Sequence, residues 1–198
     1  MIMQALKEQT RAAHDQVEAI SYSNNIMNGS LNLKQYTTII VANYIFNKAV
    51  EEKAYPAIAE KGLAAPFELD ARHKTELLEA DLNVLGIDAT EVEALTPEIS
   101  TTEQAMGYLY VAEGSTLGGA VIARALATNP NLTDVTTYNF YGCYGANVGP
   151  MWKNFIIAME STAPRLNNND AIVAGGQDAF NFFGKCLEVA KAYTQAEV

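Results

Sequence analysis

The chain has 198 residues, of which 49% are apolar and 18% are charged, and its formal net charge is −10. This length and composition are typical of one globular domain with a sizeable core, so we predict a single domain over residues 1–198. The acidic balance argues against nucleic-acid binding and against binding to an anionic membrane, because both require a cationic surface.

The sequence shows no sign of membrane insertion or export. No stretch approaches the roughly 18 apolar residues of a membrane span, and the first 14 residues lack the continuous apolar core of a signal peptide. Two cysteines, Cys143 and Cys186, are too few for a disulfide scaffold and are expected to be buried, reduced thiols. We therefore expect a cytosolic protein.

Helical periodicity dominates the first half of the chain. Apolar residues at three-four spacing predict an amphipathic helix over residues 3–19. A second helix is predicted over residues 33–61, closed by Gly62 and kinked or ended by Pro56. A third is predicted over residues 67–85.

The second half continues the helical pattern. We predict a long helix over residues 102–128, a mixed aromatic segment over 133–148 with one short helix and a turn, and a helix over 150–162. A loop is expected at 164–170, before a last helix over 171–195. Few segments alternate as strands do, so the predicted fold class is all-α.

Glycine is unusually dense inside the predicted helix over residues 102–128. The run Glu113-Gly-Ser-Thr-Leu-Gly-Gly119 contains three glycines, and each glycine in a helix interior costs roughly 0.5–1 kcal/mol relative to alanine. At about 100° per residue, the small residues that share one face, with Ser115 at its edge, are Gly107, Val111, Gly114 and Gly118. Such a face can receive either a second helix or a flat ligand.

The chain has only two histidines, His14 and His73. Neither has Glu three residues before it, which argues against a di-iron carboxylate site, and a zinc site of several His or Cys ligands is equally poorly supported. A single histidine can ligate a metal that brings its own remaining ligands, as haem does. His73, followed by Lys74, is expected on the surface of a charged helix.

Four polar residues form a stripe along the first predicted helix, beside its apolar face: Lys7, Arg11, His14 and Glu18. Two of them are cations within two turns of His14, suitable for haem propionates. The same pattern also fits a hydrogen-bonded histidine on a solvated helix face, and the glycines also fit close helix packing. From spacing alone both interpretations stay open.

Three segments resemble the haem oxygenase family. Residues 6–18, LKEQTRAAHDQVE, are similar to the proximal helix of the family, and residues 110–119, YVAEGSTLGG, are similar to the distal helix, especially that of bacterial members. Residues 142–155, which end in Trp-Lys-Asn-Phe, resemble the segment that leads into a later helix with propionate contacts. The order and separation of the three segments match the family over most of the chain.

The resemblance implies a multi-helix fold in which haem lies between the proximal and distal helices. It makes His14 the iron ligand, and Glu18 a residue that orders the surroundings of that ligand. The implied cofactor-binding positions are Lys7, Arg11, His14, Glu18, Gly114, Gly118, Gly119 and Lys153. The implied catalytic positions are Gly114, Ser115 and Gly118.

Two positions depart from the pattern of the family. Ser115 stands where mammalian members have an aspartate that organises distal water, and Ile157 stands where some members have an arginine. Serine has one donor and two acceptor sites but no charge. Bacterial relatives with a similar Glu-Gly-Ser run carry the same kind of replacement, and the attacked meso carbon of the ring is left open.

The implied reaction is the oxidative opening of haem to biliverdin, carbon monoxide and ferrous iron. It uses O2 and electrons from a transient external donor, a ferredoxin, flavodoxin or reductase, because no flavin or nicotinamide motif is evident. Two alternatives remain at this stage. One is a non-catalytic haem carrier or sensor on the same fold, and the other is a helical interaction domain in which the glycines only pack two helices.

Overall fold

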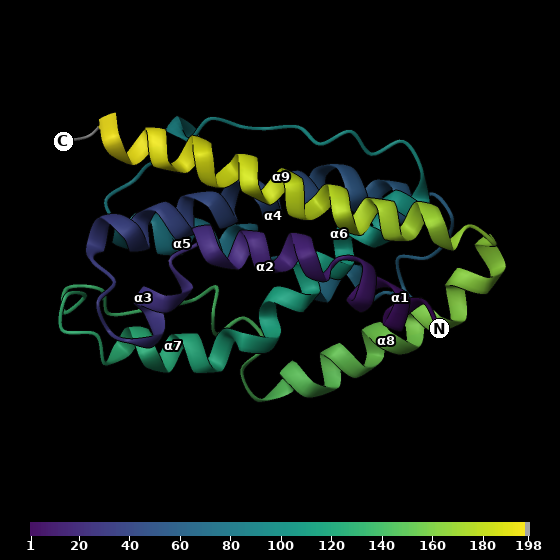
Figure 1. Cartoon of the computed structure of the whole chain (residues 1–198), viewed down its shortest axis with the longest axis horizontal. Helices are drawn as coiled ribbons and strands as arrows, with labels where there is room; N and C mark the ends of the chain where they lie inside the picture. Colours follow the sequence, from purple (N-terminus) through teal and green to yellow (C-terminus); the bar gives the residue numbers. More distant parts are fainter. Residues whose placement is uncertain (197–198) are drawn as a thin grey trace.

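The computed structural model describes residues 1–196, and within this range the secondary structure is helical, without strands. Three long helices form the centre of the molecule: α4 (Leu33–Ala59), α6 (Thr102–Gly114) and α9 (Asn169–Ala196) pack against one another. In Figure 1, α9 crosses the top of the view, with α4 and α6 behind and below it. One cluster of buried apolar residues connects all three helices. The predicted all-α fold is confirmed.

The predicted N-terminal helix is interrupted. It consists of α1 (Ile2–Gln9) and α2 (Arg11–Ile20), separated at Thr10. The buried Thr10 hydroxyl donates to the carbonyl of Leu6 at 2.7 Å, a local bond that competes with regular helix geometry. The prediction of one continuous helix was therefore wrong at Thr10, whose effect on the helix depends on its burial.

The α2 helix lies in front of the central layer, between α9 above and the lower helices (Figure 1). A short helix that the sequence analysis did not predict, α3 (Ser23–Met27), follows it and contacts α7 (Gly119–Ala127). The lower layer consists of α7 and α8 (Val148–Leu166). α8 contacts α1 and α6. The N-terminal helices α1 and α2 are thus linked to the segment after α6 in two places, through α3 to α7 and through α8 to η3 (Ser115–Gly118).

The predicted helix over residues 102–128 is divided by a 3₁₀ turn. α6 ends at Gly114, the turn η3 (Ser115–Gly118) follows, and α7 begins at Gly119. The Ser115 hydroxyl donates to Ala112 O at 2.8 Å, and that of Thr116 donates to Glu113 O at 2.7 Å. These bonds reach back three residues, the spacing of a 3₁₀ turn.

Two other element boundaries differ from the prediction. The α-helix expected over 67–85 is formed only by α5 (Thr75–Val84), and the residues before it form turns and the short 3₁₀ helix η1 (Leu69–Ala71), which bury Phe67 and Arg72. The loop expected at 164–170 is helical through Leu166. Pro164 removes only one backbone donor close to the helix end, and the left-handed Asn167, at φ 53°, ends α8 instead.

The fold bears on two predictions, that no segment spans a membrane and that both cysteines are buried thiols. Within residues 1–196 no helix combines the length and apolarity needed to cross a bilayer. Both cysteines are free thiols: Cys186 is buried, as expected, whereas Cys143 is only half-buried.

Candidate functional site

His14 lies on α2 with about half of its side chain exposed. Its Nδ1 is 3.4 Å from Asp15 Oδ1 and 3.8 Å from Glu18 Oε2, and its ring packs edge-on against Phe180 at 5.7 Å. The ligand atoms of His14, Asp15 and Glu18 lie within 4.8 Å of one another. Carboxylates beside Nδ1 favour the proton on that nitrogen, which makes Nε2 the nitrogen able to ligate a metal. The position predicted for Glu18 beside His14 matches this geometry.

The predicted cationic residues are on the surface. Arg11 is 82% exposed and lies 3.8 Å from Asp15, and Lys7 on α1 and Lys153 on α8 are exposed. No acidic group of the described residues lies within 4 Å of either lysine ammonium. α1 and α8 contact each other, and the Glu160 carboxylate accepts from the backbone of Ile2 and Met3 at 3.2 and 3.0 Å.

The glycines of the 102–128 region have different surroundings. A Cβ on Gly107 would lie 2.3 Å from Ile172 O in α9, and one on Gly119 would lie 2.6 Å from Tyr141 O. Both glycines are therefore needed for close packing of protein on protein. This accounts for Gly119 without a ligand.

Gly114 and Gly118 differ from those two glycines. A Cβ on Gly114 would meet nothing within 4 Å, and one on Gly118 would meet only Ile122 Cδ1 at 3.6 Å. The face that the sequence analysis assigned to Gly107, Gly114 and Gly118 is thus covered by α9 at Gly107 and open further along. No contact with residues 1–196 requires glycine at the two open positions.

Ser115 is exposed between these two open glycines. Its hydroxyl hydrogen is used inside the helix, in the bond to Ala112 O. The oxygen keeps its lone pairs and remains available as an acceptor. As a result, Ser115 can accept a hydrogen bond from water or ligand, whereas its donor is already engaged.

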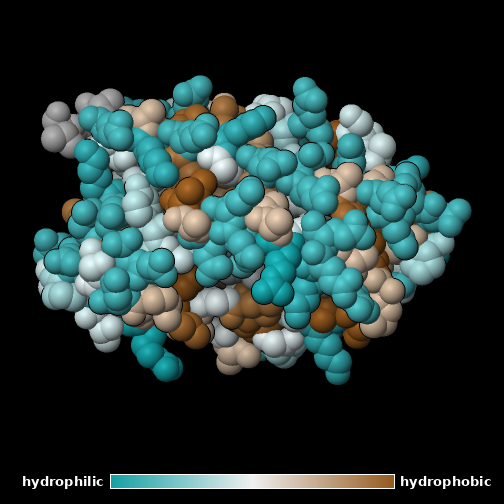
Figure 2. Space-filling model, viewed as in Figure 1, coloured by the Kyte–Doolittle hydropathy of each residue, from teal (hydrophilic) through white to brown (hydrophobic). Residues whose placement is uncertain are grey.

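Apolar side chains are exposed on the elements around these residues. Figure 2 shows apolar surface along the lower part of the view, where α7 and α8 lie in Figure 1. The large apolar residues exposed on α2, η3, α7 and α8 are Ile20 at 43%, Leu117 at 47%, Val121 at 58% and Ile157 at 57%. Exposed apolar side chains on the elements that carry His14 and the open glycines, and on α8, suit a ligand with a large flat apolar surface.

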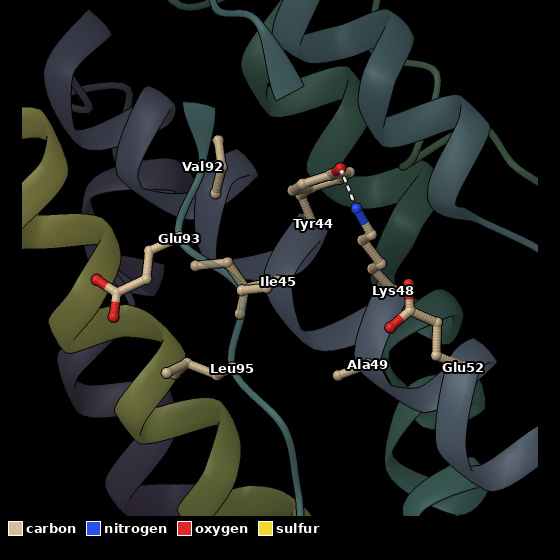
Figure 3. A pocket seen from close by; sticks show the side chains of 9 residues that line it. Tyr44, Ile45, Lys48, Ala49, Glu52, Val92, Glu93 and Leu95 are labelled. Atoms are coloured by element: carbon tan, nitrogen blue, oxygen red, sulfur yellow. Dashed lines mark hydrogen bonds between the residues drawn. The ribbon is translucent and has the colours of Figure 1, made fainter. Parts of the chain in front are cut away.

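A separate hollow lies between α4 and residues 92–95, and Figure 3 shows its lining, including the hydrogen bond from Lys48 Nζ to Tyr44 OH at 3.1 Å. Its cavity of about 10 Å³ holds one water at most. None of the predicted site residues lines it. This hollow is therefore not the ligand site.

Comparison with known proteins identifies the family of the chain. The haem oxygenase family model matches residues 1–189. The chain belongs to the haem oxygenase family. The family predicted from residues 6–18 and 110–119 is confirmed, and with it an enzyme of the haem oxygenase class.

The chain matches curated haem oxygenases along most of its length. It is 28% identical to the haem oxygenase PigA of Pseudomonas aeruginosa over 190 residues, which cover 93% of this chain and 90% of that protein. It is 35% identical to a haem oxygenase of Xanthomonas campestris over 119 residues, which cover 59% and 68% of the two chains.

Solved haem oxygenase structures share the fold. The NO- and CO-bound haem oxygenase of Neisseria meningitidis superposes with a TM-score of 0.72 at 22% identity, over 97% of this chain and 92% of that one. Haem oxygenase-1 of the cyanobacterium Synechocystis, in complex with haem, gives 0.71 at 16% identity, over 99% and 95%. At these identities the likeness establishes the all-α fold of the family.

In this haem oxygenase a buried charge cluster, which the sequence analysis missed, adjoins the glycine segment. Arg72 and Lys74 are 0% and 1% exposed, and both pair with the carboxylate of Glu113, itself 1% exposed. The Lys74 ammonium is 2.6 Å from Glu113 Oε1, and the Tyr144 hydroxyl donates to both carboxylate oxygens at 3.0 Å. His73 was expected at the surface, followed by Lys74 on a charged helix, but Lys74 lies just before α5 and is buried beside Tyr144 of the 138–147 loop.

The cluster ties three parts of the chain to the start of η3. Glu113 precedes Gly114, the two cations come from residues 72–74, and Tyr144 comes from the loop before α8. Burial, and after it the charge of Glu113, raises the pKa of the Tyr144 hydroxyl, which therefore stays protonated and donates. The run Glu-Gly-Ser indicated the adjacent ligand face, but no local pattern indicated the partners of Glu113.

Proposed function

We propose that this chain binds haem between α2 and η3 and opens its ring to biliverdin, carbon monoxide and ferrous iron, using O2 and electrons from an external donor. The observation that carries the proposal is the open space at Gly114 and Gly118. A side chain has room at both positions, and no contact with the described residues requires glycine there. A flat ligand that approaches the backbone closely supplies a reason for both residues.

The donor set on the chain fits haem. His14 offers Nε2 to iron while Asp15 and Glu18 hold the opposite ring nitrogen. Lys7, Arg11 and Lys153 are the cations available for the propionates. When bound, haem is both cofactor and substrate and supplies the chemistry of O2.

The distal residues contribute small size and a few polar groups. Gly114 and Gly118 leave room for a small diatomic ligand, and the exposed apolar side chains of Leu117 and Val121 limit the access of water. Ser115 offers an oxygen acceptor, which orders water but cannot supply a charge.

The test of this function is a haemin titration, followed in the same cuvette by ascorbate with catalase present. The proposal predicts a one-to-one complex with a Soret band, which then decays as the broad red absorption of biliverdin grows. A stable complex that is reduced but never degraded would favour a haem carrier or sensor. If no complex forms at all, the glycines only pack helices, and the haem proposal is wrong.

Electrons are proposed to come from an acidic protein such as a ferredoxin, flavodoxin or reductase, docking on Lys7, Arg11 and Lys153. These cations are exposed on a chain whose net charge is −10. Opposite charges steer association and make its rate depend on salt. In the double variant Lys7→Ala/Arg11→Ala, saturated with haemin, reduction by the protein donor should therefore be slower and its salt dependence flatter, and this loss should exceed any change in reduction by ascorbate, which needs no docking site. An unaltered salt dependence would place the donor elsewhere.

Alanine substitutions at adjacent glycines separate ligand contact from packing. In Gly118→Ala the new Cβ meets protein only at 3.6 Å, so the free energy of unfolding of the apoprotein should be unchanged or about 0.5–1 kcal/mol higher. Its haemin affinity should fall about tenfold, or about 1.4 kcal/mol. Urea unfolding and haemin titration measure the two quantities.

Gly119→Ala is the matched comparison and should show the opposite pattern. Its Cβ would lie 2.6 Å from Tyr141 O, so overpacking should destabilise the apoprotein by about 1–3 kcal/mol. Wild-type haemin affinity in Gly118→Ala would mean that the ligand does not approach this glycine.

A further inference from the structure

Two central helices touch at their backbones where glycines face each other. A Cβ on Gly175 of α9 would lie 2.4 Å from Gln104 O of α6, and one on Gly107 of α6 would lie 2.4 Å from Gly176 N. No side chain separates the helices at this crossing. Their separation there is therefore set by backbone contact alone.

The N-terminal helices α1 and α2 pack on α9 at the same place. A Cβ on Gly176 would lie 2.9 Å from Leu6 Cδ2 and 3.2 Å from Thr10 Cγ2. Leu6 and Thr10 are 0% and 2% exposed, and Thr10 is the residue that separates α1 from α2. Beside them, Gln177 Nε2 of α9 donates to Gln9 O at 3.1 Å. Thr10, at the break between α1 and α2, thus packs directly on Gly176.

We propose that Gly176 is a positioning residue that sets the separation of α2 from the α6–η3 segment. The inference rests on the proposed haem site, because those two elements carry its opposite walls. His14 follows Thr10 by about one helical turn, and Gly114 follows Gly107 by about two. The N-terminal helices and α6 both pack on α9 at Gly175 and Gly176. A shift at Gly176 therefore moves α2 relative to the α6–η3 segment.

A methyl group at Gly176 requires Leu6 and Thr10 to give way, and both are restrained. Leu6 can change rotamer only within a packed core. Thr10 is β-branched and its hydroxyl is bonded to Leu6 O at 2.7 Å, which restrains its rotation. The proximal backbone must therefore move, and α2 moves with it.

The experiment compares Gly176→Ala with Gly184→Ala, a glycine of the same helix whose Cβ would meet nothing within 4 Å. Gly176→Ala should release haemin to an excess of apomyoglobin about tenfold faster than wild type, and should change the ratio of biliverdin isomers. Amide hydrogen exchange of its apoprotein should rise in residues 2–20 and stay unchanged in α4. Gly184→Ala should match wild type in all three measurements.

The outcomes distinguish this inference from the haem proposal. Wild-type haemin release and wild-type exchange in a folded Gly176→Ala would overturn the positioning role. If wild type itself binds no haemin, the proposed function fails, while hydrogen exchange of the apoprotein still tests whether Gly176 seats the proximal helices. Should Gly176→Ala not fold, the double variant Leu6→Val/Gly176→Ala removes the closest atom and is measured against Leu6→Val in the same way.

Discussion

His14→Ala is expected to weaken haemin binding at least about 100-fold and to abolish turnover with ascorbate. The imidazole is the single histidine of α2, with its Nδ1 beside the carboxylates of Asp15 and Glu18. Loss of a residue that only orients a metal ligand typically costs about 10–100-fold, so loss of the ligand itself should cost more. Haemin titration and the position of the Soret band measure the effect.

His73→Ala is the matched control, because it removes the other histidine of the chain. His73 lies just before α5 and is about half-exposed, and its Nδ1 is 2.9 Å from Oε2 of Glu51 in α4. This variant should bind haemin like wild type, and added imidazole should restore part of the Soret complex in His14→Ala alone. Full turnover in His14→Ala without imidazole would exclude His14 as the iron ligand.

Glu113→Gln should lower the free energy of unfolding of the apoprotein by about 3–5 kcal/mol, the usual consequence of removing one partner of a buried ion pair. The substitution keeps the size of the side chain, so little of the effect arises from a cavity. It leaves the buried cations Arg72 and Lys74 without their shared anion. Urea unfolding followed by circular dichroism measures the change.

Two further variants show whether the charge cluster is responsible. Glu103→Gln removes a carboxylate at the other end of α6, where no ion pair forms among the described residues, and should change stability by less than about 1 kcal/mol. Lys74→Met leaves the pair of Arg72 and Glu113 in place and should cost less than Glu113→Gln. Equal stability of Glu113→Gln and wild type would show that the charges do not hold η3 in position.

The predictions that were confirmed depend on residues that lie close together in the sequence. The all-α fold follows from three-four spacing, a local property of each helix. The family was recognised from residues 6–18 and 110–119, in which the motif residues are neighbours along the chain. The proximity of His14 and Glu18 follows in the same way, because residues four apart share a helix face.

Contacts between distant residues determined what the sequence did not indicate. The break at Thr10 depends on its burial against Gly176, and the burial of Lys74 depends on Glu113, 39 residues later. Residues 67–74 have helix-compatible side chains but do not form an α-helix. Helix propensities of ordinary residues differ by only a few tenths of a kcal/mol, and tertiary packing overrides such differences.

By itself, the sequence determined that the chain is helical, that one histidine faces outward from the first helical segment, and that glycines gather at one later place. The tertiary structure alone decided the use of each glycine: α9 covers Gly107, the 138–147 loop covers Gly119, and Gly114 and Gly118 stay open. A helical wheel specifies direction around one axis, whereas the neighbour found in that direction depends on the paths of all the other helices. For that reason the glycine-rich face could be predicted from the sequence, but which of its glycines stay uncovered could not.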